Sequence, residues 1–178
     1  MHIDDLKVSP LDLPCLEQNE RILKWDLRYL RMIKNEICTW SKDPSTQVGS
    51  VIVRDTNKFV SLGYNGYASS DEDDASLDNR EEKYERVIHA EINAILFSKR
   101  DLTGCTLYVW PLAPCSRCAG PIAQVGIKRV VSVTPVASVQ EKWIKSMQHT
   151  YKIFKNAGID FVLYPNSILC INKSGGNE

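Results

Sequence analysis

Two short motifs constrain what this chain can fold into more than any other feature of its sequence. A His-x-Glu motif begins at His89, and a Pro-Cys-x-x-Cys motif ends at Cys118. A catalytic zinc site needs three protein ligands and a fourth position left open for water. We therefore predict that His89, Cys115 and Cys118 bind Zn2+. Glu91 is left beside the open position, where we expect it to carry protons.

The segments around the two motifs predict where these ligands lie. We expect a buried helix over 92–97 and a strand over 106–110, then a helix over 119–125 and a strand over 128–133. Both ligand groups then lie at helix starts, where free backbone N–H groups and the helix dipole favour a thiolate over a thiol. Because both helices are next to neighbouring strand ends, they should lie side by side.

Length and composition narrow the class of protein. A chain of 178 residues is expected to form one domain. Its formal net charge of zero gives no support for binding a nucleic-acid polymer. Its apolar runs are shorter than the ~20 residues that a membrane span needs. The cysteines outside the ligand pair are scattered without a disulfide framework, so we expect a reducing, cytoplasmic location and no membrane partner.

Apolar periodicity and turn residues divide the rest of the chain. Apolar residues at helical spacing predict helices over 20–40 and 138–157. Two apolar runs, over 47–54 and 59–63, are separated by turn residues and are expected to form a hairpin. A long acidic connection follows over 67–86, and its last part is expected to be helical.

The order of these elements predicts a three-layer α/β/α fold. With a last strand over 159–164, the elements give a five-stranded mixed sheet. Right-handed crossovers between its strands place helices on its faces. We expect an N-terminal extension over 1–19, a zinc-dependent domain over 20–165 and a C-terminal tail over 166–178.

Four stretches extend the pattern beyond the zinc motifs. They lie within 41–49, 63–66, 83–95 and 114–127. In these stretches the chain resembles the deoxycytidylate (dCMP) deaminases of the cytidine deaminase superfamily. The resemblance covers most of the chain, and it implies the cytidine-deaminase-like fold.

The resemblance also implies an activity and a set of substrate contacts. The activity is zinc-dependent hydrolysis of dCMP to dUMP with release of ammonia. Asn65 is expected to hold the deoxyribose. The Ala90 N–H and the Ala113 carbonyl are expected to read the edge of the base. Ser41 and Lys42 are the candidates for binding the phosphate.

Assembly and control are implied in the same way. We expect a homo-oligomer, specifically a hexamer, with effector binding of dCTP or dTTP together with Mg2+ near the acidic connection. The acidic residues of that connection would repel a triphosphate unless a metal ion bridges them. Bulky apolar residues at Trp143, Met147 and Tyr151 could serve either an interface or the core.

Three other interpretations of the motifs stay open. The enzyme could act on dCTP or on a modified deoxycytidine nucleotide. It could instead deaminate a base within a polynucleotide, which would require a basic groove with stacking aromatic residues. The zinc site could also be structural, either closed by a fourth ligand or part of a binding module. Glu91 argues against that last interpretation, because a purely structural site has no use for it.

Overall fold

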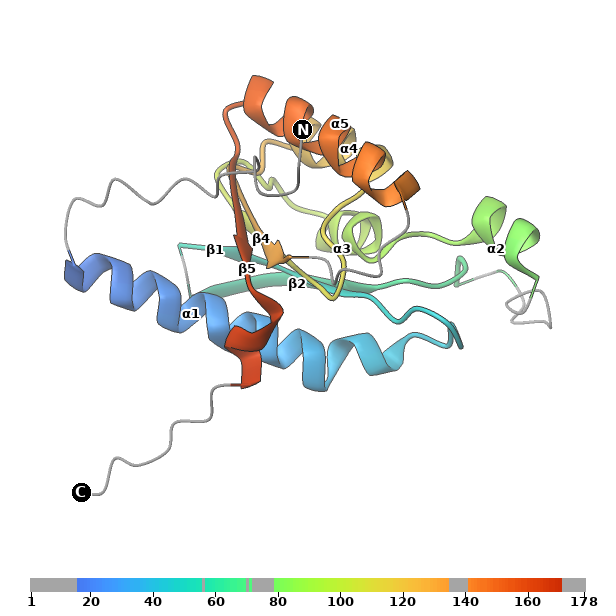
Figure 1. The fold of residues 1–178 in the computed structure, drawn as a ribbon, viewed down its shortest axis with the longest axis horizontal. Helices are drawn as coiled ribbons and strands as arrows, with labels where there is room; N and C mark the ends of the chain where they lie inside the picture. Colours follow the sequence, from blue (N-terminus) through green and yellow to red (C-terminus); the bar gives the residue numbers. More distant parts are fainter. Residues whose placement is uncertain (1–15, 56, 70, 72–78, 135–140, 171–178) are drawn as a thin grey trace.

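A five-stranded sheet runs through the centre of the molecule in the computed structural model of the chain (Figure 1). The structure describes residues 16–55, 57–69, 71, 79–134 and 141–170. The strands are β1 (Gly49–Arg54), β2 (Lys58–Tyr64), β3 (Thr106–Trp110), β4 (Arg129–Val133) and β5 (Asp160–Tyr164). They lie in the order β2-β1-β3-β4-β5, which confirms the predicted sheet.

The sheet is mixed because its connections differ. A tight turn joins β1 to β2, so these strands are antiparallel and form the predicted hairpin. Strand β1 is also antiparallel to β3, whereas β3, β4 and β5 are parallel to one another. Parallel neighbours need a crossover, usually a helix, and helical segments connect each of these pairs.

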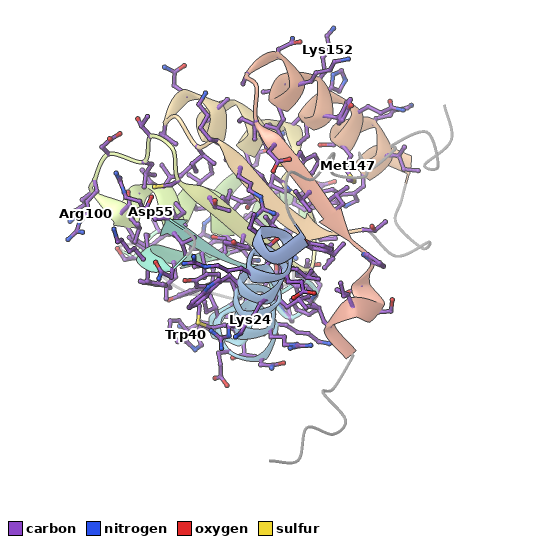
Figure 2. The ribbon with its side chains drawn as sticks, turned by 90° about the vertical axis from the view of Figure 1, so that its left-hand side faces the viewer. Lys24, Trp40, Asp55, Arg100, Met147 and Lys152 are labelled. Atoms are coloured by element: carbon purple, nitrogen blue, oxygen red, sulfur yellow. The ribbon has the colours of Figure 1, made fainter. Side chains whose placement is uncertain are left out.

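Helices cover both faces of the sheet and confirm the three-layer arrangement (Figure 1). One face carries α1 (Leu16–Asn35) and the short 3-10 helix η2 (Ile37–Trp40). The other face carries α3 (Ala90–Ser98), α4 (Ser116–Gln124) and α5 (Glu141–Asn156). Helix α2 (Arg80–Arg86) stands beyond the end of β2, and the 3-10 helix η4 (Asn166–Cys170) follows β5. Figure 2 shows Lys24 of α1 and Lys152 of α5 on opposite sides of the sheet.

Each face of the sheet has its own apolar core. Successive residues of a strand point to opposite faces, so Ile52 and Leu107 pack toward α3, α4 and α5, whereas Val51 and Tyr108 pack toward α1. Met147 of α5 is buried, so this part of the predicted stripe serves the core. The predicted functional residues all lie outside the α1 core.

The prediction of one continuous helix over 20–40 is wrong. Glu36 leaves helical geometry, with φ −127° and ψ −66°, so α1 ends before η2 begins. The turn brings η2 onto Gly49 of β1, where an added Cβ would lie 3.0 Å from the backbone nitrogen of Cys38 and 3.1 Å from a methyl carbon of Ile37. The packing of η2 against β1 therefore accounts for the end of α1 at Asn35.

The prediction that the helix over 92–97 is buried is wrong for its last two residues. Leu96 and Phe97 are 57% and 58% exposed, whereas Asn93 and Ala94 are buried. Helix α3 packs on β2, which is the edge strand of the sheet. A short helix at a sheet edge can cover only one of its sides, and an unbroken apolar run does not reveal which side that is.

The remaining predicted elements agree with the structure where it describes them. Asn79 caps α2, because its side chain accepts hydrogen bonds from the N–H groups of Glu81 and Glu82. Residues 138–140 of the predicted last helix, and 72–78 of the acidic connection, lie outside the described residues.

The predicted domain boundaries stay predictions. Helix α1 begins at Leu16, inside the predicted extension, and most of that extension lies outside the described residues. The segment predicted as a tail begins with η4, whose Leu169 is buried in the α1 core. In the described part of the chain, the helices are too short or too polar to cross a membrane.

Candidate active site

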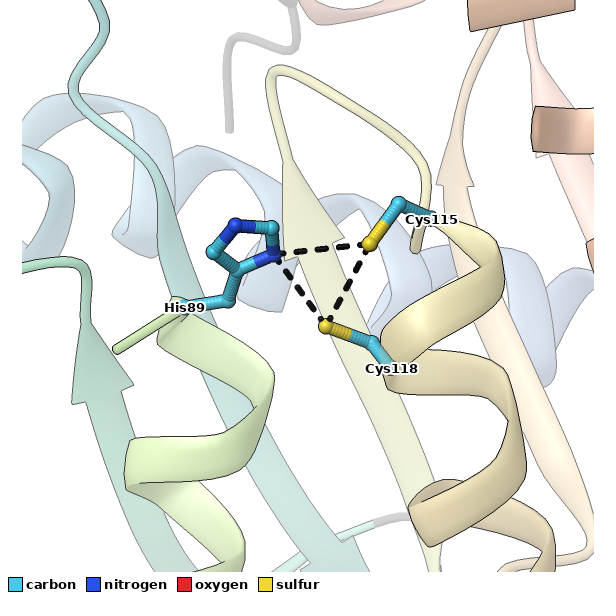
Figure 3. Close-up of side chains that lie close together, drawn as sticks. All are labelled: His89, Cys115 and Cys118. Atoms are coloured by element: carbon cyan, nitrogen blue, oxygen red, sulfur yellow. Dashed lines mark hydrogen bonds between the residues drawn. The ribbon is translucent and has the colours of Figure 1, made fainter. Parts of the chain in front are cut away.

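The predicted zinc ligands lie together where α3 and α4 begin (Figure 3). His89 is the N-cap residue of α3, and Cys115 is the N-cap residue of α4. His89 Nδ1 lies 3.5 Å from Cys115 Sγ and 3.3 Å from Cys118 Sγ. The two sulfur atoms are 3.7 Å apart. Helices α3 and α4 lie side by side, as predicted.

These three separations fit a tetrahedral zinc ion. Zn–S bonds of about 2.3 Å and Zn–N bonds of about 2.0–2.1 Å put tetrahedral S···S pairs about 3.8 Å apart and N···S pairs about 3.6 Å apart. A disulfide bond would instead require about 2.0 Å between the sulfur atoms, and both cysteines are free. Across the described ranges, this is the one cluster of three or more His, Cys, Asp or Glu side chains that could share an ion.

The cysteine loop is held in place by α5. Thr150 donates a hydrogen bond from Oγ1 to the Pro114 carbonyl at 3.0 Å. The Ser116 N–H donates to Ser146 Oγ, also at 3.0 Å. Within the loop, the Cys118 N–H donates to the Cys115 carbonyl at 3.0 Å, which closes the first turn of α4. These hydrogen bonds orient the loop so that the two thiols face the same point.

The histidine is placed by contacts between β1, β2 and α3. Ser50 of β1 donates to the Ala90 carbonyl at 2.8 Å. An added Cβ at Gly63 would collide with that same carbonyl, so β2 approaches α3 this closely because residue 63 is glycine. Gly66 and Ile88 form an isolated bridge, with hydrogen bonds of 3.1 and 2.8 Å, immediately before the ligand histidine.

Sequence reasoning missed Ser50 as a supporting residue. Ser50 directly precedes the aliphatic run 51–53, and a serine beside a run that will be buried signals a polar partner opposite, because buried polar groups are almost always hydrogen-bonded. Thr150 and Ser146 had no comparable signal, since isolated hydroxyl residues in a surface helix are common.

Glu91 lies in the first turn of α3, beside the ligand cluster. It is 3% exposed. Burial raises the pKa of its carboxyl group, and this outweighs the lowering effects of the nearby His89 imidazole and of a hydrogen bond from Cys118. A carboxyl group with a raised pKa can both take and return a proton near neutral pH. Its position and its environment therefore suit proton transfer.

The thiols and the imidazole also perturb one another. The hydrogen bond between the two thiols, together with the His89 contact, lowers the pKa of Cys115 to about 4. The same bond, together with burial, raises the pKa of Cys118. The hydrogen bond with Cys115 raises the pKa of His89. A thiol that binds a metal ion is deprotonated outright, so metal binding would release the proton that Cys118 holds.

The residues predicted to bind the substrate flank this cluster. Ala90 is the first residue of α3, and the buried Ala113 lies in the loop two positions before the first ligand cysteine. Asn65 is buried, and its Oδ1 accepts a hydrogen bond from the Val48 N–H at 2.8 Å. Its Nδ2 donates to the Thr46 carbonyl at 2.9 Å.

Ser41 and Lys42 differ in their surroundings. The hydroxyl group of Ser41 is buried and donates to the Asn65 carbonyl at 2.8 Å, whereas Lys42 is exposed. The structure thus brings Ser41 and Asn65 into contact, and Lys42 follows directly in the chain. Their contacts with a substrate stay predictions.

The chain is similar in sequence to a known protein family over most of its length. The model of the family described as "Cytidine and deoxycytidylate deaminase zinc-binding region" matches residues 23–134. An uncharacterized deaminase of Aliivibrio fischeri is 43% identical over 148 residues, which cover 83% of this chain and 99% of the relative. The deoxycytidylate deaminase of Mus musculus is 36% identical over 159 residues, which cover 84% of each chain.

Solved structures share the fold. The dCMP deaminase of cyanophage S-TIM5 in apo form has a TM-score of 0.60 at 20% identity, and the match covers 79% of this chain and 97% of that one. The same protein in complex with dCMP and dUMP has a TM-score of 0.57 at 20% identity, covering 84% and 98%. The expected cytidine-deaminase-like fold is confirmed.

Proposed function

The chain belongs to the cytidine and deoxycytidylate deaminase family, and we propose that it hydrolyses dCMP to dUMP and ammonia. One observation carries the proposal: the buried carboxyl group of Glu91 interacts with three side chains whose donor atoms have tetrahedral zinc spacing. His89, Cys115 and Cys118 would hold the ion. When bound, Zn2+ supplies a Lewis acid that lowers the pKa of water from 15.7 toward about 7. The relative in Mus musculus, which is named for this substrate, supports the choice of dCMP.

Glu91 carries the protons of the proposed reaction. Its carboxylate takes a proton from the water molecule that attacks C4 of the cytosine ring. It gives that proton to N3, which relieves the negative charge that builds on the ring. It then moves the second proton of the water to the amine, which leaves as ammonia, and C4 keeps the oxygen. One carboxylate serves as base and acid in turn, so it must not bind the metal itself.

Backbone groups would read the edge of the base. The Ala90 N–H lies at the start of α3, where N–H groups have no acceptor within the helix. The Ala113 carbonyl lies in the buried loop before the ligand cysteine. Asn65 would hold the deoxyribose through Oδ1, because an amide oxygen has two lone pairs and the Val48 N–H uses one of them.

The loop that begins at Ser41 would hold the phosphate. Lys42 is exposed and contributes a positive charge that can meet the phosphate directly. Ser41 is buried against the Asn65 carbonyl, so its contribution is mainly to fix the loop. Because Ser41 contacts Asn65, the proposed phosphate contact of Lys42 and the proposed deoxyribose contact of Asn65 would lie next to each other.

We also propose assembly and control on the basis of the family. Leu96, Phe97 and Trp40 are large apolar side chains that are more than half exposed, which supports a homo-oligomer. The choice of a hexamer rests on the family resemblance alone. Regulation by dCTP or dTTP with Mg2+ is proposed near the acidic connection. Buried free cysteines such as Cys38 and Cys105, together with thiol ligands, favour the reducing cytoplasm as the location.

A substrate panel tests the proposed function. Ammonia release from the zinc-loaded enzyme is measured with dCMP, dCTP, deoxycytidine and a single-stranded oligodeoxynucleotide at equal concentrations. We expect the highest kcat/KM with dCMP. Faster turnover of dCTP would replace dCMP by the alternative nucleotide. Activity on the oligodeoxynucleotide alone would contradict a small-nucleotide enzyme.

A further inference from the structure

A buried ion pair joins α2 to the loop that follows η2. Lys83 Nζ lies 3.1 Å from Asp43 Oδ1 and 2.7 Å from Ser45 Oγ. The Lys83 and Asp43 side chains are only 9% and 5% exposed. Lysine is almost never this buried unless it is paired. Removing one partner of a buried pair leaves an uncompensated charge, whereas surface pairs contribute little. Both partners of Lys83 belong to the loop, so its ammonium group fixes how α2 and the loop meet.

Asp43 gathers the loop around the ammonium group. Its Oδ1 accepts hydrogen bonds from the Ser45 N–H at 2.8 Å, from Ser45 Oγ at 2.8 Å and from the Thr46 N–H at 3.0 Å. Burial alone would raise the pKa of Asp43, but these bonds and the Lys83 contact lower it. The loop therefore closes on one charged oxygen, and Lys83 lies against that oxygen.

The same loop leads to the proposed substrate site. Ser41 donates to the Asn65 carbonyl, and the Val48 N–H donates to the Asn65 side chain. The residue after Asn65 bridges to Ile88, which precedes the ligand histidine. A continuous set of hydrogen bonds thus runs from the loop to the start of α3. Lys42 lies between Ser41, which this set holds in place, and Asp43, which Lys83 holds in place.

We propose that Lys83 is a positioning residue for the substrate phosphate. By holding Asp43, it fixes the backbone on one side of Lys42, while the Ser41 hydrogen bond fixes the other side. Lys83 itself is buried against the loop, so it acts through Lys42. Helix α2 then belongs to the frame of the active site, although it stands beyond the end of β2 (Figure 1). The inference rests on the proposed role of this loop in binding the phosphate of dCMP.

The substitution Lys83→Met tests this role, because it removes the charge and keeps an unbranched side chain. We expect KM for dCMP to rise at least roughly tenfold, since a small misplacement of a positioning group has large kinetic effects. The kcat for dCMP should stay within about threefold, and turnover of deoxycytidine, which has no phosphate, within about twofold. Zinc content and Tm are measured for every variant.

Coupling to Lys42 separates positioning from a general structural role. Lys83→Met combined with Lys42→Ala should be no worse with dCMP than Lys42→Ala alone, because residues that act through one another are not additive. Lys83→Arg, which keeps the charge, should recover part of the affinity. Independent, multiplying effects of the two substitutions, or equal losses with dCMP and deoxycytidine, would overturn the inference.

Two further variants keep the test decisive. If Lys83→Met does not fold, Ser45→Ala removes one partner of the ammonium group. We then expect a smaller rise in KM for dCMP, and an unchanged KM would overturn the inference.

Lys58→Met is the matched control. Lys58 pairs with Asp55 at 3.0 Å on the exposed hairpin turn, so this substitution should leave the kinetics unchanged. Failure of the parent enzyme to prefer dCMP over deoxycytidine would reject the proposed function. A clear preference in the parent, with no effect of Lys83→Met, would reject the Lys83 inference alone.

Discussion

Two buried carboxyl groups lie on opposite faces of the same sheet, and their surroundings differ. Asp26 of α1 is fully buried and accepts hydrogen bonds from the hydroxyl groups of Tyr108 and Tyr164, each at 2.8 Å. Arg129 donates to the same carboxylate from Nη1 at 2.8 Å and from Nη2 at 2.7 Å. A carboxylate has about four acceptor positions, so Asp26 is saturated.

Glu91 is nearly as buried as Asp26, but its carboxyl group has fewer hydrogen-bond partners. Within the described part of the chain, its carboxyl group interacts with the Cys118 thiol and with its own backbone N–H, and the His89 imidazole lies close by. Burial raises its pKa, and the carboxyl group keeps acceptor positions that the protein does not use. A saturated buried carboxylate stabilises the fold, whereas an unsaturated one can still exchange protons with a substrate.

Removing a zinc ligand should have the largest effect. Cys115→Ala leaves two protein ligands where a catalytic zinc site needs three, so we expect bound zinc and deaminase activity to fall to background. Metal analysis of the purified protein checks this. Cys105→Ala is the matched control, because Cys105 is a buried free cysteine outside the ligand cluster. Full zinc occupancy in Cys115→Ala would contradict the assignment.

Changing the unsaturated carboxylate should have the next largest effect. Glu91→Gln keeps the shape of the side chain but cannot accept a proton. General acid–base groups contribute about 10²–10⁴-fold, and because Glu91 acts in several steps we expect a loss of kcat at or above the top of that range. Zinc content and Tm should match the parent enzyme. Near-normal turnover of a folded, zinc-loaded variant would show that Glu91 is not the proton carrier.

Changing the saturated carboxylate should affect stability and spare the chemistry. Asp26→Asn leaves the mostly buried Arg129 without a full counter-charge, and breaking such a pair costs about 3–5 kcal/mol of unfolding free energy. The kcat of the folded enzyme should stay within about twofold. Urea unfolding and steady-state kinetics measure both quantities.

Asp160 offers a matched control for that comparison. It pairs with the same arginine at 3.1 Å, but its side chain is 54% exposed. Asp160→Asn should therefore cost less than about 1 kcal/mol. A loss of kcat in Asp26→Asn as large as that in Glu91→Gln would break the comparison between the two faces.

The smallest expected effect concerns the pH dependence of a third buried carboxylate. Hydrogen bonds lower the pKa of Asp43 against the opposing effect of burial. A folded-state pKa below the unfolded value of about 3.9 gives stability that is fully present above that pH and is lost as the pH falls through the folded pKa. The difference in unfolding free energy between the parent and Asp43→Asn should therefore be constant from neutral pH to about pH 5 and shrink below about pH 4. A difference that grows on acidification would contradict this sign.

Local sequence patterns predicted most of the secondary structure, and they failed where distant packing decided. The helix over 20–40 is split at Glu36 because η2 turns onto Gly49 of β1. The helix over 92–97 exposes Leu96 and Phe97 because it covers an edge strand. Periodicity reports what a segment can bury, but the neighbouring elements decide which side is buried.

Local sequence patterns fix the donor types of the site and the pairing of its two thiols. Cys115 and Cys118 are three positions apart at a helix start, so the local geometry of one turn brings their sulfur atoms together. The motifs also predicted that His89 meets these thiols, whereas no sequence pattern indicated that Asp26 is saturated or that Lys83 holds Asp43. Those contacts join segments that are distant in the chain, and such contacts depend on strand order and helix placement, which local periodicity does not encode.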